Sequence, residues 1–215
     1  MNTIVSHATL QALSQLGAAT IYEAQWAQGA LDSGIKPIAP GMRISGPALT
    51  VDTRAGDNLM LHYALLKAKP GDVLVVDAKG FAEAGLWGDV LTEQAQKVGL
   101  AGLVINGAVR DAAAMIAVGF PVFCRGLSIK GTSKSQAGLL NVPITIGEVR
   151  IAPGDIIVGD QDGLVVVNQH EVEEVLALAR AREDKEALFR ERIRSGVSTV
   201  ELLGLADTLK RLNLV

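Results

Sequence analysis

Hydrophobic positions in the middle of the chain alternate between short aliphatic runs and segments with helical spacing. Segments 58–68, 89–99 and 111–119 place apolar residues three or four positions apart, which predicts helices. The aliphatic runs around them predict strands at 43–52, 72–78, 102–108, 121–126, 143–147, 149–152, 155–160 and 164–168. This order predicts a mixed or parallel α/β fold.

Both ends of the chain have a helical pattern. After the last strand, residues 170–195 predict one long helix with charged side chains nearly all round from 180 to 194. Glu186 stands four residues before Arg190, in the favourable orientation for an ion pair. The charged surface of this helix either faces solvent or packs against another subunit. We expect a single domain, 1–215, that includes a helical extension from about 170 to 215.

The composition narrows the function classes. Hydrophobic residues make up 49% of the chain but aromatic residues only 4%, so aliphatic side chains must fill the core. The formal charge is −3 and Lys and Arg do not cluster, which argues against nucleic-acid binding. The chain has no apolar run of membrane-spanning length, and its first residues lack a signal-peptide pattern. We expect a cytoplasmic protein that does not bind membranes.

Several residues that could carry chemistry have a simpler structural interpretation. Cys124 is the only cysteine, which excludes an internal disulfide, and we expect it to be a small buried strand residue. His62 has helical apolar neighbours and fits a core or interface position better than a metal site. The pair at 57–58 is expected to cap the helix that follows, and the acidic pair at 160 and 162 to form a tight turn.

The segment from Gly85 to Met115 holds the most informative polar residues. Asp89 stands at the start of a predicted helix, where it could cap the helix or sit beside a bound carboxylate. Arg110 and Asp111 follow a predicted strand at the end where α/β sheets carry their sites, although a cap with an ion pair would also explain them. Together they supply a guanidinium for an oxyanion and a carboxylate for a hard divalent cation, which suits enolate chemistry without a Schiff-base lysine.

At these residues the chain resembles the 4-hydroxy-4-methyl-2-oxoglutarate/4-carboxy-4-hydroxy-2-oxoadipate aldolases, which share their fold with the regulator of RNase E activity A. The motif is Asp89, a spacer of twenty residues, then Arg110 and Asp111. The resemblance covers nearly the whole chain and includes TIYEAQ, AGDNLMLHYAL, PGDVLVVDAKG, WGDVL, NGAVRD, FPVFCRG, GTSK, PGDIIVGDQDGLVVV and KEALFRERIRSG.

The resemblance implies roles for the central residues. Asp111 would bind a divalent metal, usually Mg²⁺, with Mn²⁺ and Co²⁺ as alternatives. Arg110 would hold the substrate and stabilise the enolate oxygen. Asp89 would act in acid–base chemistry through the water shell of the metal.

The resemblance also places residues at the two ends of the substrate. Gly88 and the backbone N–H groups of Val90 and Leu91 would receive the pyruvyl carboxylate. Lys134 in GTSK matches a basic position near the distal carboxylate, although it lies in a loop whose flexibility alone would explain its neighbours.

Two acidic residues match positions that reach the site from a neighbouring subunit. Glu23 would belong to the catalytic set, and Glu186 would lie in the outer shell of the metal. Their simpler interpretations are an exposed acid on a surface helix for Glu23 and a partner of Arg190 for Glu186.

The fold implied is a swivelling β/β/α domain with a long C-terminal helix, assembled as a trimer or as a hexamer of two trimers. The implied reaction is cleavage of 4-hydroxy-4-methyl-2-oxoglutarate or 4-carboxy-4-hydroxy-2-oxoadipate to pyruvate plus pyruvate or oxaloacetate. Oxaloacetate decarboxylation should accompany it, and the breakdown of aromatic compounds is the usual source of such substrates.

Two other functions compete with the aldolase. The first is a non-catalytic regulator that binds a protein partner such as a ribonuclease. Regulators of this fold carry glycine in place of Asp89 and an acidic residue in place of Ala114, so both positions favour the aldolase. The second is a methyltransferase, but no glycine-rich loop for an adenosyl cofactor follows the first strand.

Overall fold

The computed structural model describes residues 5–215. The first four residues, part of the stretch considered above for a signal peptide, lie outside the described residues. In the described part, the main sheet has the strand order β1-β5-β4-β3-β2-β9-β10, with β6 paired to β2. Its strands are β1 (Lys36–Pro37), β2 (Ile44–Asp52), β3 (Val73–Trp87), β4 (Gly102–Val109), β5 (Val122–Leu127), β6 (Leu139–Leu140), β9 (Ile156–Gly159) and β10 (Leu164–Val167).

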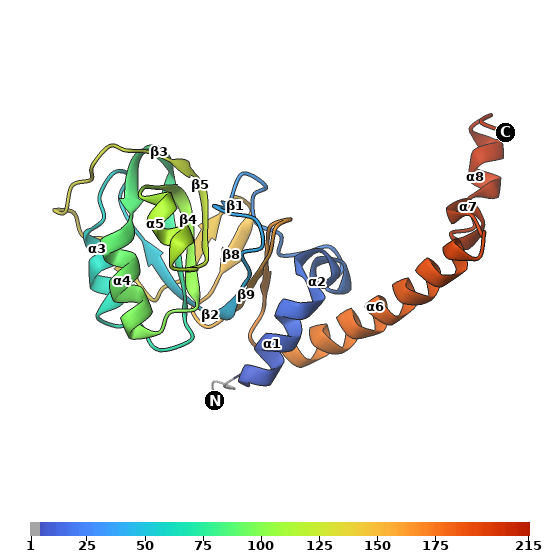
Figure 1. Ribbon diagram of the computed structural model, residues 1–215, viewed down its shortest axis with the longest axis horizontal. Helices are drawn as coiled ribbons and strands as arrows, with labels where there is room; N and C mark the ends of the chain where they lie inside the picture. Colours follow the sequence, from blue (N-terminus) through green and yellow to red (C-terminus); the bar gives the residue numbers. More distant parts are fainter. Residues whose placement is uncertain (1–4) are drawn as a thin grey trace.

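Strands β2, β3, β4 and β5 are parallel neighbours, and the remaining strands of the sheet pair antiparallel. The helices α3 (Leu59–Leu65), α4 (Asp89–Val98) and α5 (Ala112–Ala117) lie together beside the parallel strands, at the left in Figure 1. Aliphatic side chains of α3, α4, β3 and β4 form the core between these layers, as the sparse aromatic content requires. The predicted α/β fold is confirmed.

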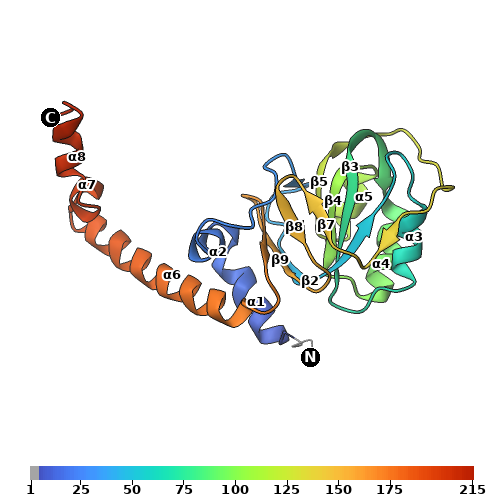
Figure 2. The same ribbon diagram turned by 180° about the vertical axis from the view of Figure 1, so that it is seen from behind.

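The opposite face of the sheet is covered by other segments. The hairpin of β7 (Ile144–Ile146) and β8 (Val149–Ile151) contributes to a second aliphatic core with β9 and β10. Figure 2 shows this hairpin from behind. The helices α1 (His7–Leu16) and α2 (Ala18–Ala24) pack with the start of α6 (Val172–Arg194) around a third core beside β9 and β10.

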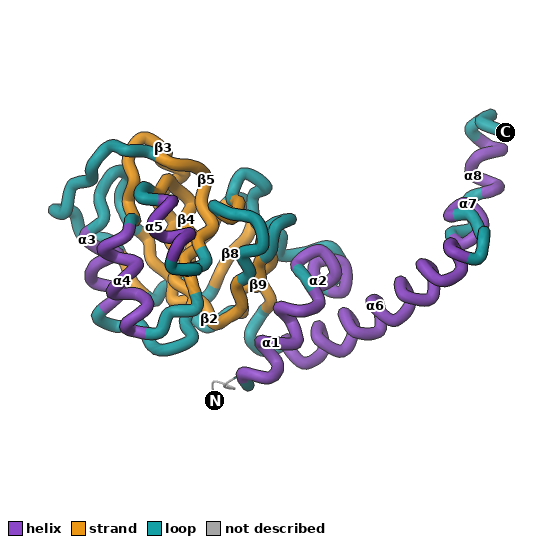
Figure 3. Tube along the Cα trace, viewed as in Figure 1, coloured by secondary structure: helices purple, strands orange, loops and turns teal. Residues whose placement is uncertain are grey.

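The C-terminal helices form an arm that leaves the rest of the fold (Figures 1 and 3). The buried residues of α6 all lie in its first third, from Val172 to Ala179. Beyond them the arm continues through α7 (Thr199–Leu202) and α8 (Ala206–Arg211), neither of which has a buried residue. The predicted helix at 170–195 is confirmed. No helix among residues 5–215 has the length and apolar character needed to cross a bilayer.

Strand β3 is longer than the sequence predicts. The expected strand covered 72–78, but β3 continues to Trp87 through register shifts against β4. Lys79 and Gly80 at the first shift have positive φ values of 61° and 70°. The continuation was missed because residues 79–84 lack an aliphatic run. It carries the chain to the edge of the sheet where the polar residues gather.

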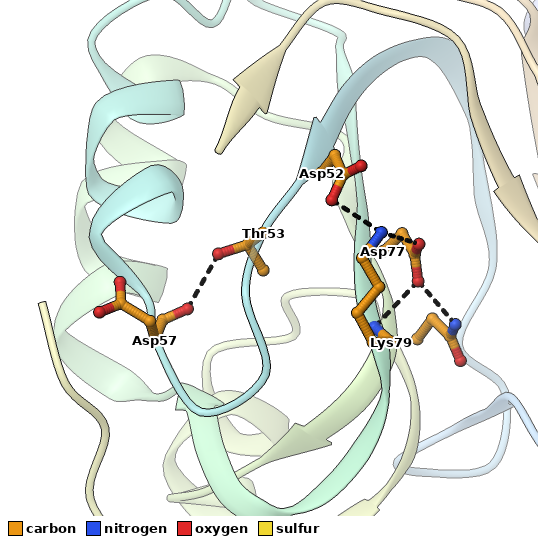
Figure 4. A network of polar contacts seen from close by, with 6 residues as sticks. Asp52, Thr53, Asp57, Asp77 and Lys79 are labelled. Atoms are coloured by element: carbon orange, nitrogen blue, oxygen red, sulfur yellow. Dashed lines mark hydrogen bonds and ion pairs between the residues drawn. The ribbon is translucent and has the colours of Figure 1, made fainter. Parts of the chain in front are cut away.

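A row of polar side chains crosses the parallel strands on the face opposite α3–α5. Asp52, Asp77 and Asn106 occupy paired positions on β2, β3 and β4. Lys79 Nζ lies 2.7 Å from Asp52 Oδ1 and 2.6 Å from Asp77 Oδ2, and Asn106 Nδ2 donates to Asp77 Oδ1 at 2.8 Å (Figure 4). Arg125 of β5 extends the row by donating to Asn106 Oδ1. The buried carboxylate of Asp77 is therefore both paired and hydrogen-bonded.

Candidate functional site

The predicted polar residues meet where two neighbouring strands end. Strand β3 ends at Trp87, and α4 begins two residues later at Asp89. Strand β4 ends at Val109, directly opposite Trp87, and Arg110 follows it. The backbone N–H of Arg110 donates to the carbonyl of Trp87 at 2.8 Å, which fixes the two strand exits side by side. The expected meeting of the two turns is confirmed.

The carboxylate of Asp111 does not cap α5, the helix that follows it. It precedes α5 with left-handed φ and ψ values of 56° and 34°, and its side chain makes no capping hydrogen bond. Asp111 Oδ2 instead lies 3.3 Å from Arg110 Nε and 3.4 Å from the backbone nitrogen of Asp89. Of the cap and ion pair weighed as the simpler explanation, the ion pair is present. Asp111 does not cap α5, but it accepts a hydrogen bond from the first backbone N–H of α4.

Gly88 allows the close approach of the two turns. A Cβ atom at this position would lie 2.4 Å from Asp111 Oδ2 and 3.1 Å from Arg110 Cγ. No side chain larger than hydrogen fits without moving the carboxylate of Asp111. This steric requirement is not visible in the sequence, because it depends on residues more than twenty positions away.

A cavity of about 180 Å³ lies beside these turns. Its lining includes the whole predicted substrate-binding set, namely Gly88, Val90, Leu91, Arg110 and Lys134, together with Asp89 of the predicted catalytic set. Asp111 lines an adjoining hollow of about 300 Å³ together with Arg110, Leu127 and Ser128. Arg110 therefore lines both cavities, the one beside the first backbone amides of α4 and the one beside Asp111.

Besides residues of the end of β3, the smaller cavity is also lined by Asn58, His62 and Thr132, which were not predicted as site residues. Asn58 Nδ2 donates to the carbonyl of Leu86 at 2.9 Å, while Asn58 Oδ1 and His62 Nε2 are buried without a hydrogen-bond partner. Burial and the nearby charge of Lys134 lower the pKa of His62. The spacing of four residues between Asn58 and His62 was the available signal, since it places both on one face of a helix.

The backbone donors at the start of α4 are only partly free. The Val90 N–H donates to Asp89 Oδ1 at 2.7 Å, so the carboxylate of Asp89 occupies the amide expected to bind substrate. Leu91 lies in the same first turn, where helix geometry provides no backbone acceptor for its N–H. A bound carboxylate would compete with the Asp89 side chain for the N–H of Val90. It could accept a hydrogen bond from the N–H of Leu91 without displacing another group.

The carboxylates at the site suit a hard cation that keeps most of its water. Asp111 Oδ2 accepts from the backbone N–H of Asp89 at 3.4 Å, while the carboxylate of Asp89 accepts from the Val90 N–H. Within residues 5–215, no group of three or more His, Cys, Asp or Glu side chains could enclose a metal. One carboxylate with water ligands is the donor set that Mg²⁺ accepts readily. Asp111 would hold such an ion, with Asp89 beside it.

Glu23 and Glu186 lie away from the cavity in the chain described here. Glu23 of α2 pairs with Arg182 of α6, and Arg182 Nη2 also lies 3.0 Å from Glu186 Oε1. Arg190 Nη1 lies 3.5 Å from Glu186 Oε2, which matches the simpler interpretation of that residue. In Figure 1, α2 and α6 lie across the sheet from α4 and α5. Within one chain these residues form a separate cluster.

The other candidates have structural roles. Cys124 is buried in β5, and burial raises the pKa of its thiol to about 11. Asp160 accepts hydrogen bonds from the backbone of Asp162 and Ala18, so it closes a turn and caps α2. Asp57 accepts from the backbone nitrogen of Leu59 at 2.9 Å at the start of α3, as expected for a helix cap.

A larger hollow, about 840 Å³, lies elsewhere, between α2, β8 and the start of α6. It contains none of the predicted central residues. Asp155 on its wall already accepts hydrogen bonds from the backbone of Ala152 and Gln169. The smaller cavity is the better candidate because polar groups without partners converge there.

Comparison with known proteins agrees with the geometry. The family model described as RraA-like, Aldolase/RraA, matches residues 18–166. The chain belongs to this RraA-like, Aldolase/RraA family. A protein of Halalkalibacterium halodurans named "Putative 4-hydroxy-4-methyl-2-oxoglutarate aldolase" is 45% identical over 161 residues, which cover 74% of this chain and 77% of that protein. The RraA-like resemblance seen in the sequence is confirmed.

Solved structures of RraA-like proteins share the fold. An uncharacterised protein from Pseudomonas syringae pv. tomato superimposes with a TM-score of 0.84 and 32% identity, covering 92% of this chain and 93% of that one. The RNA-processing inhibitor RraA from Thermus thermophilis superimposes with a TM-score of 0.64 and 28% identity, covering 70% of this chain and 91% of that one. The predicted swivelling β/β/α fold with a long C-terminal helix is confirmed.

Proposed function

We propose that this RraA-like protein is a divalent-metal-dependent lyase that breaks a carbon–carbon bond in a small 2-oxo acid. The substrates proposed are 4-hydroxy-4-methyl-2-oxoglutarate and 4-carboxy-4-hydroxy-2-oxoadipate, with pyruvate as a shared product and with accompanying oxaloacetate decarboxylation. The main support is the carboxylate of Asp111, which leaves α5 uncapped, stands beside Arg110 and faces Gly88 and the first backbone N–H of α4.

Arg110, the first turn of α4 and Asp111 would each bind a different part of the substrate or the cation. The guanidinium of Arg110 would hold the oxygen of the 2-oxo group, where negative charge develops as the bond breaks. The first turn of α4 offers the Leu91 N–H and the positive end of the helix dipole to the adjacent carboxylate. A divalent cation held by Asp111 would polarise the 2-oxo group.

Asp89 would serve in proton transfer at the substrate hydroxyl. Its carboxylate is exposed and lies on the cavity wall. Its hydrogen bond to the Val90 N–H would be exchanged for substrate on binding. The change Asp89→Asn should therefore lower the rate of bond cleavage; unchanged cleavage would remove Asp89 from the mechanism.

The proposal includes a neighbouring subunit, in a trimer or a hexamer. The outer part of the arm leaves apolar side chains such as Leu188, Ile193, Leu203 and Leu212 exposed, which suits contact with a second copy. Such a contact would allow Glu23 and Glu186 to approach a site that they do not reach within their own chain.

The activity test is pyruvate release from oxaloacetate and from 4-carboxy-4-hydroxy-2-oxoadipate, followed by coupling to lactate dehydrogenase. We expect turnover with Mg²⁺, loss of turnover with excess EDTA, and loss in Arg110→Ala. Arg150→Ala on β8 is the matched control, because Arg150 lines the distant large hollow. A folded protein with no turnover on either substrate would favour the alternative, a non-catalytic regulator that binds a protein partner.

A further inference from the structure

One wall of the cavity is a short segment without regular secondary structure. Residues 131–136 lie between β5 and β6, and they contribute Thr132 and Lys134 to the cavity lining. The hydrogen bonds found for this segment within residues 5–215 all go to Gly56, Asp57 or Asn58. The position of Lys134 therefore depends on the attachment of its segment to residues 56–58.

Asp57 provides most of that attachment. Its side chain is completely buried, and Oδ2 accepts hydrogen bonds from Ser133 Oγ at 2.7 Å, Ser135 N at 2.7 Å and Gln136 N at 3.1 Å. Oδ1 accepts from Leu59 N at 2.9 Å. One carboxylate thus joins the start of α3 to the segment that carries Lys134.

The environment keeps this carboxylate charged. Burial acts to raise the pKa of Asp57, but the four hydrogen bonds outweigh it and hold the pKa at about 2. Each of these hydrogen bonds is charge-assisted and therefore stronger than one between neutral groups. A neutral side chain of the same shape would keep one oxygen acceptor and lose the other.

The backbone of Asp57 is also fixed to the sheet. Thr53, which follows β2, donates from Oγ1 to the carbonyl of Asp57 at 3.0 Å (Figure 4). Asn58 and His62, on the helix that Asp57 begins, line the same cavity as Lys134. Asp57 itself is not part of the lining, so any effect on a ligand must pass through its neighbours.

We propose that Asp57 is a positioning residue that holds Lys134 in the wall of the cavity and so sets the preference for 2-oxo acids with a second carboxylate. This inference rests on the proposed function for the identity of the ligand. The attachment of the segment can be measured without any turnover.

The kinetic test compares two reactions of the wild type and Asp57→Asn with Mg²⁺ present. Oxaloacetate has a second carboxylate, whereas the exchange of pyruvate methyl protons with deuterium oxide needs only the pyruvyl end. We expect the KM for oxaloacetate to rise at least about tenfold, the factor that corresponds to one lost charge-assisted hydrogen bond. The exchange rate of pyruvate should change less than about twofold. Equal losses in both reactions would overturn the proposal.

Asp155→Asn is the matched control for this comparison. Asp155 is also buried and accepts two backbone hydrogen bonds, where Asp57 accepts three, but it lies beside the distant large hollow. Asp155→Asn should leave both the KM for oxaloacetate and the exchange rate of pyruvate in their wild-type ratio. Ser133→Ala removes one hydrogen bond to Asp57 from an exposed residue, and it takes the place of Asp57→Asn if that variant does not fold.

A double-mutant cycle shows whether Asp57 acts through Lys134. Lys134→Ala alone should raise the KM for oxaloacetate by a similar factor. Adding Asp57→Asn to Lys134→Ala should then have little further effect, because the group being positioned is already absent. If the factors by which the two substitutions raise the KM multiply fully in the double variant, Asp57 does not act through Lys134 and the proposal is overturned.

Amide hydrogen exchange tests the attachment itself. The N–H groups of Ser135 and Gln136 should exchange slowly in the wild type and at least about tenfold faster in Asp57→Asn. Lys134→Ala should leave them protected. Fast exchange in the wild type would overturn the attachment, whereas protected amides in a protein without turnover would count against the proposed function alone.

Discussion

Replacing Gly88 by alanine tests how much the site depends on the close approach of its two turns. The added Cβ would lie 2.4 Å from Asp111 Oδ2, about 1 Å nearer than an ordinary contact. Gly88 has φ and ψ of −156° and −165°, an extended conformation that alanine adopts easily. Any effect must therefore come from the steric contact and not from backbone strain.

The structure also shows which group has to move. The carbonyl of Gly88 accepts hydrogen bonds from the backbone and the hydroxyl of Thr92, and the backbone of Arg110 is tied to Trp87. The side chain of Asp111 is the free end, so its carboxylate should shift by about 1 Å. Misplacement on this scale costs about 100-fold in rate. The stability cost should be near 1 kcal/mol, or about 2–4 °C in Tm.

The assay is Mg²⁺-dependent pyruvate release from oxaloacetate, with thermal unfolding measured on the same samples. Gly126→Ala on β5 is the control, because a Cβ there meets no atom within 4 Å. We expect Gly88→Ala to lose activity while it keeps its fold, and Gly126→Ala to keep both. Full activity in Gly88→Ala would refute the reasoning that Asp111 must stay where it is.

Three further predictions concern single side chains. Asp111→Asn should lower Mg²⁺-dependent turnover at least about 100-fold, since it removes the charge that holds the cation; a variant with normal turnover and Mg²⁺ response would contradict this. Cys124, whose thiol pKa is raised to about 11, should resist a disulfide reagent at pH 8 until guanidinium unfolds the protein, so rapid native labelling would be the contrary result. The folded pKa of Asp57 is about 2, below its ordinary value of 3.8, so its contribution of at most about 2 kcal/mol should be complete above pH 4 and disappear as the pH falls towards 2. Urea unfolding should then show the gap between wild type and Asp57→Asn narrowing over that range; a constant gap would speak against it.

Residues close together in the sequence accounted for most of the correct predictions. The turns at 88–89 and 110–111 could be placed at the ends of neighbouring strands because each follows an aliphatic run and precedes a helical pattern. The long C-terminal helix was equally visible from its spacing. Both inferences use only local periodicity, which a single sequence displays directly.

The remaining features depend on contacts between distant segments. The attachment of residues 131–136 to Asp57 joins positions more than seventy residues apart, and no local pattern reports it. The left-handed backbone of Asp111 is likewise invisible in its sequence neighbours, yet it decides whether the carboxylate caps α5 or faces Gly88 and the start of α4. These details follow from tertiary packing, so only the folded chain reveals them.

The polar row on β2, β3 and β4 has a consequence for how the chain finds its native pairing. The strands around it are almost entirely aliphatic, and such strands can pair in several alignments at similar cost. A slip of one residue would turn Asp77 and Asn106 towards the helices, where the core is apolar and offers no partner. Misaligned sheets are therefore penalised during folding, and the native alignment is selected by groups that take no part in the proposed chemistry.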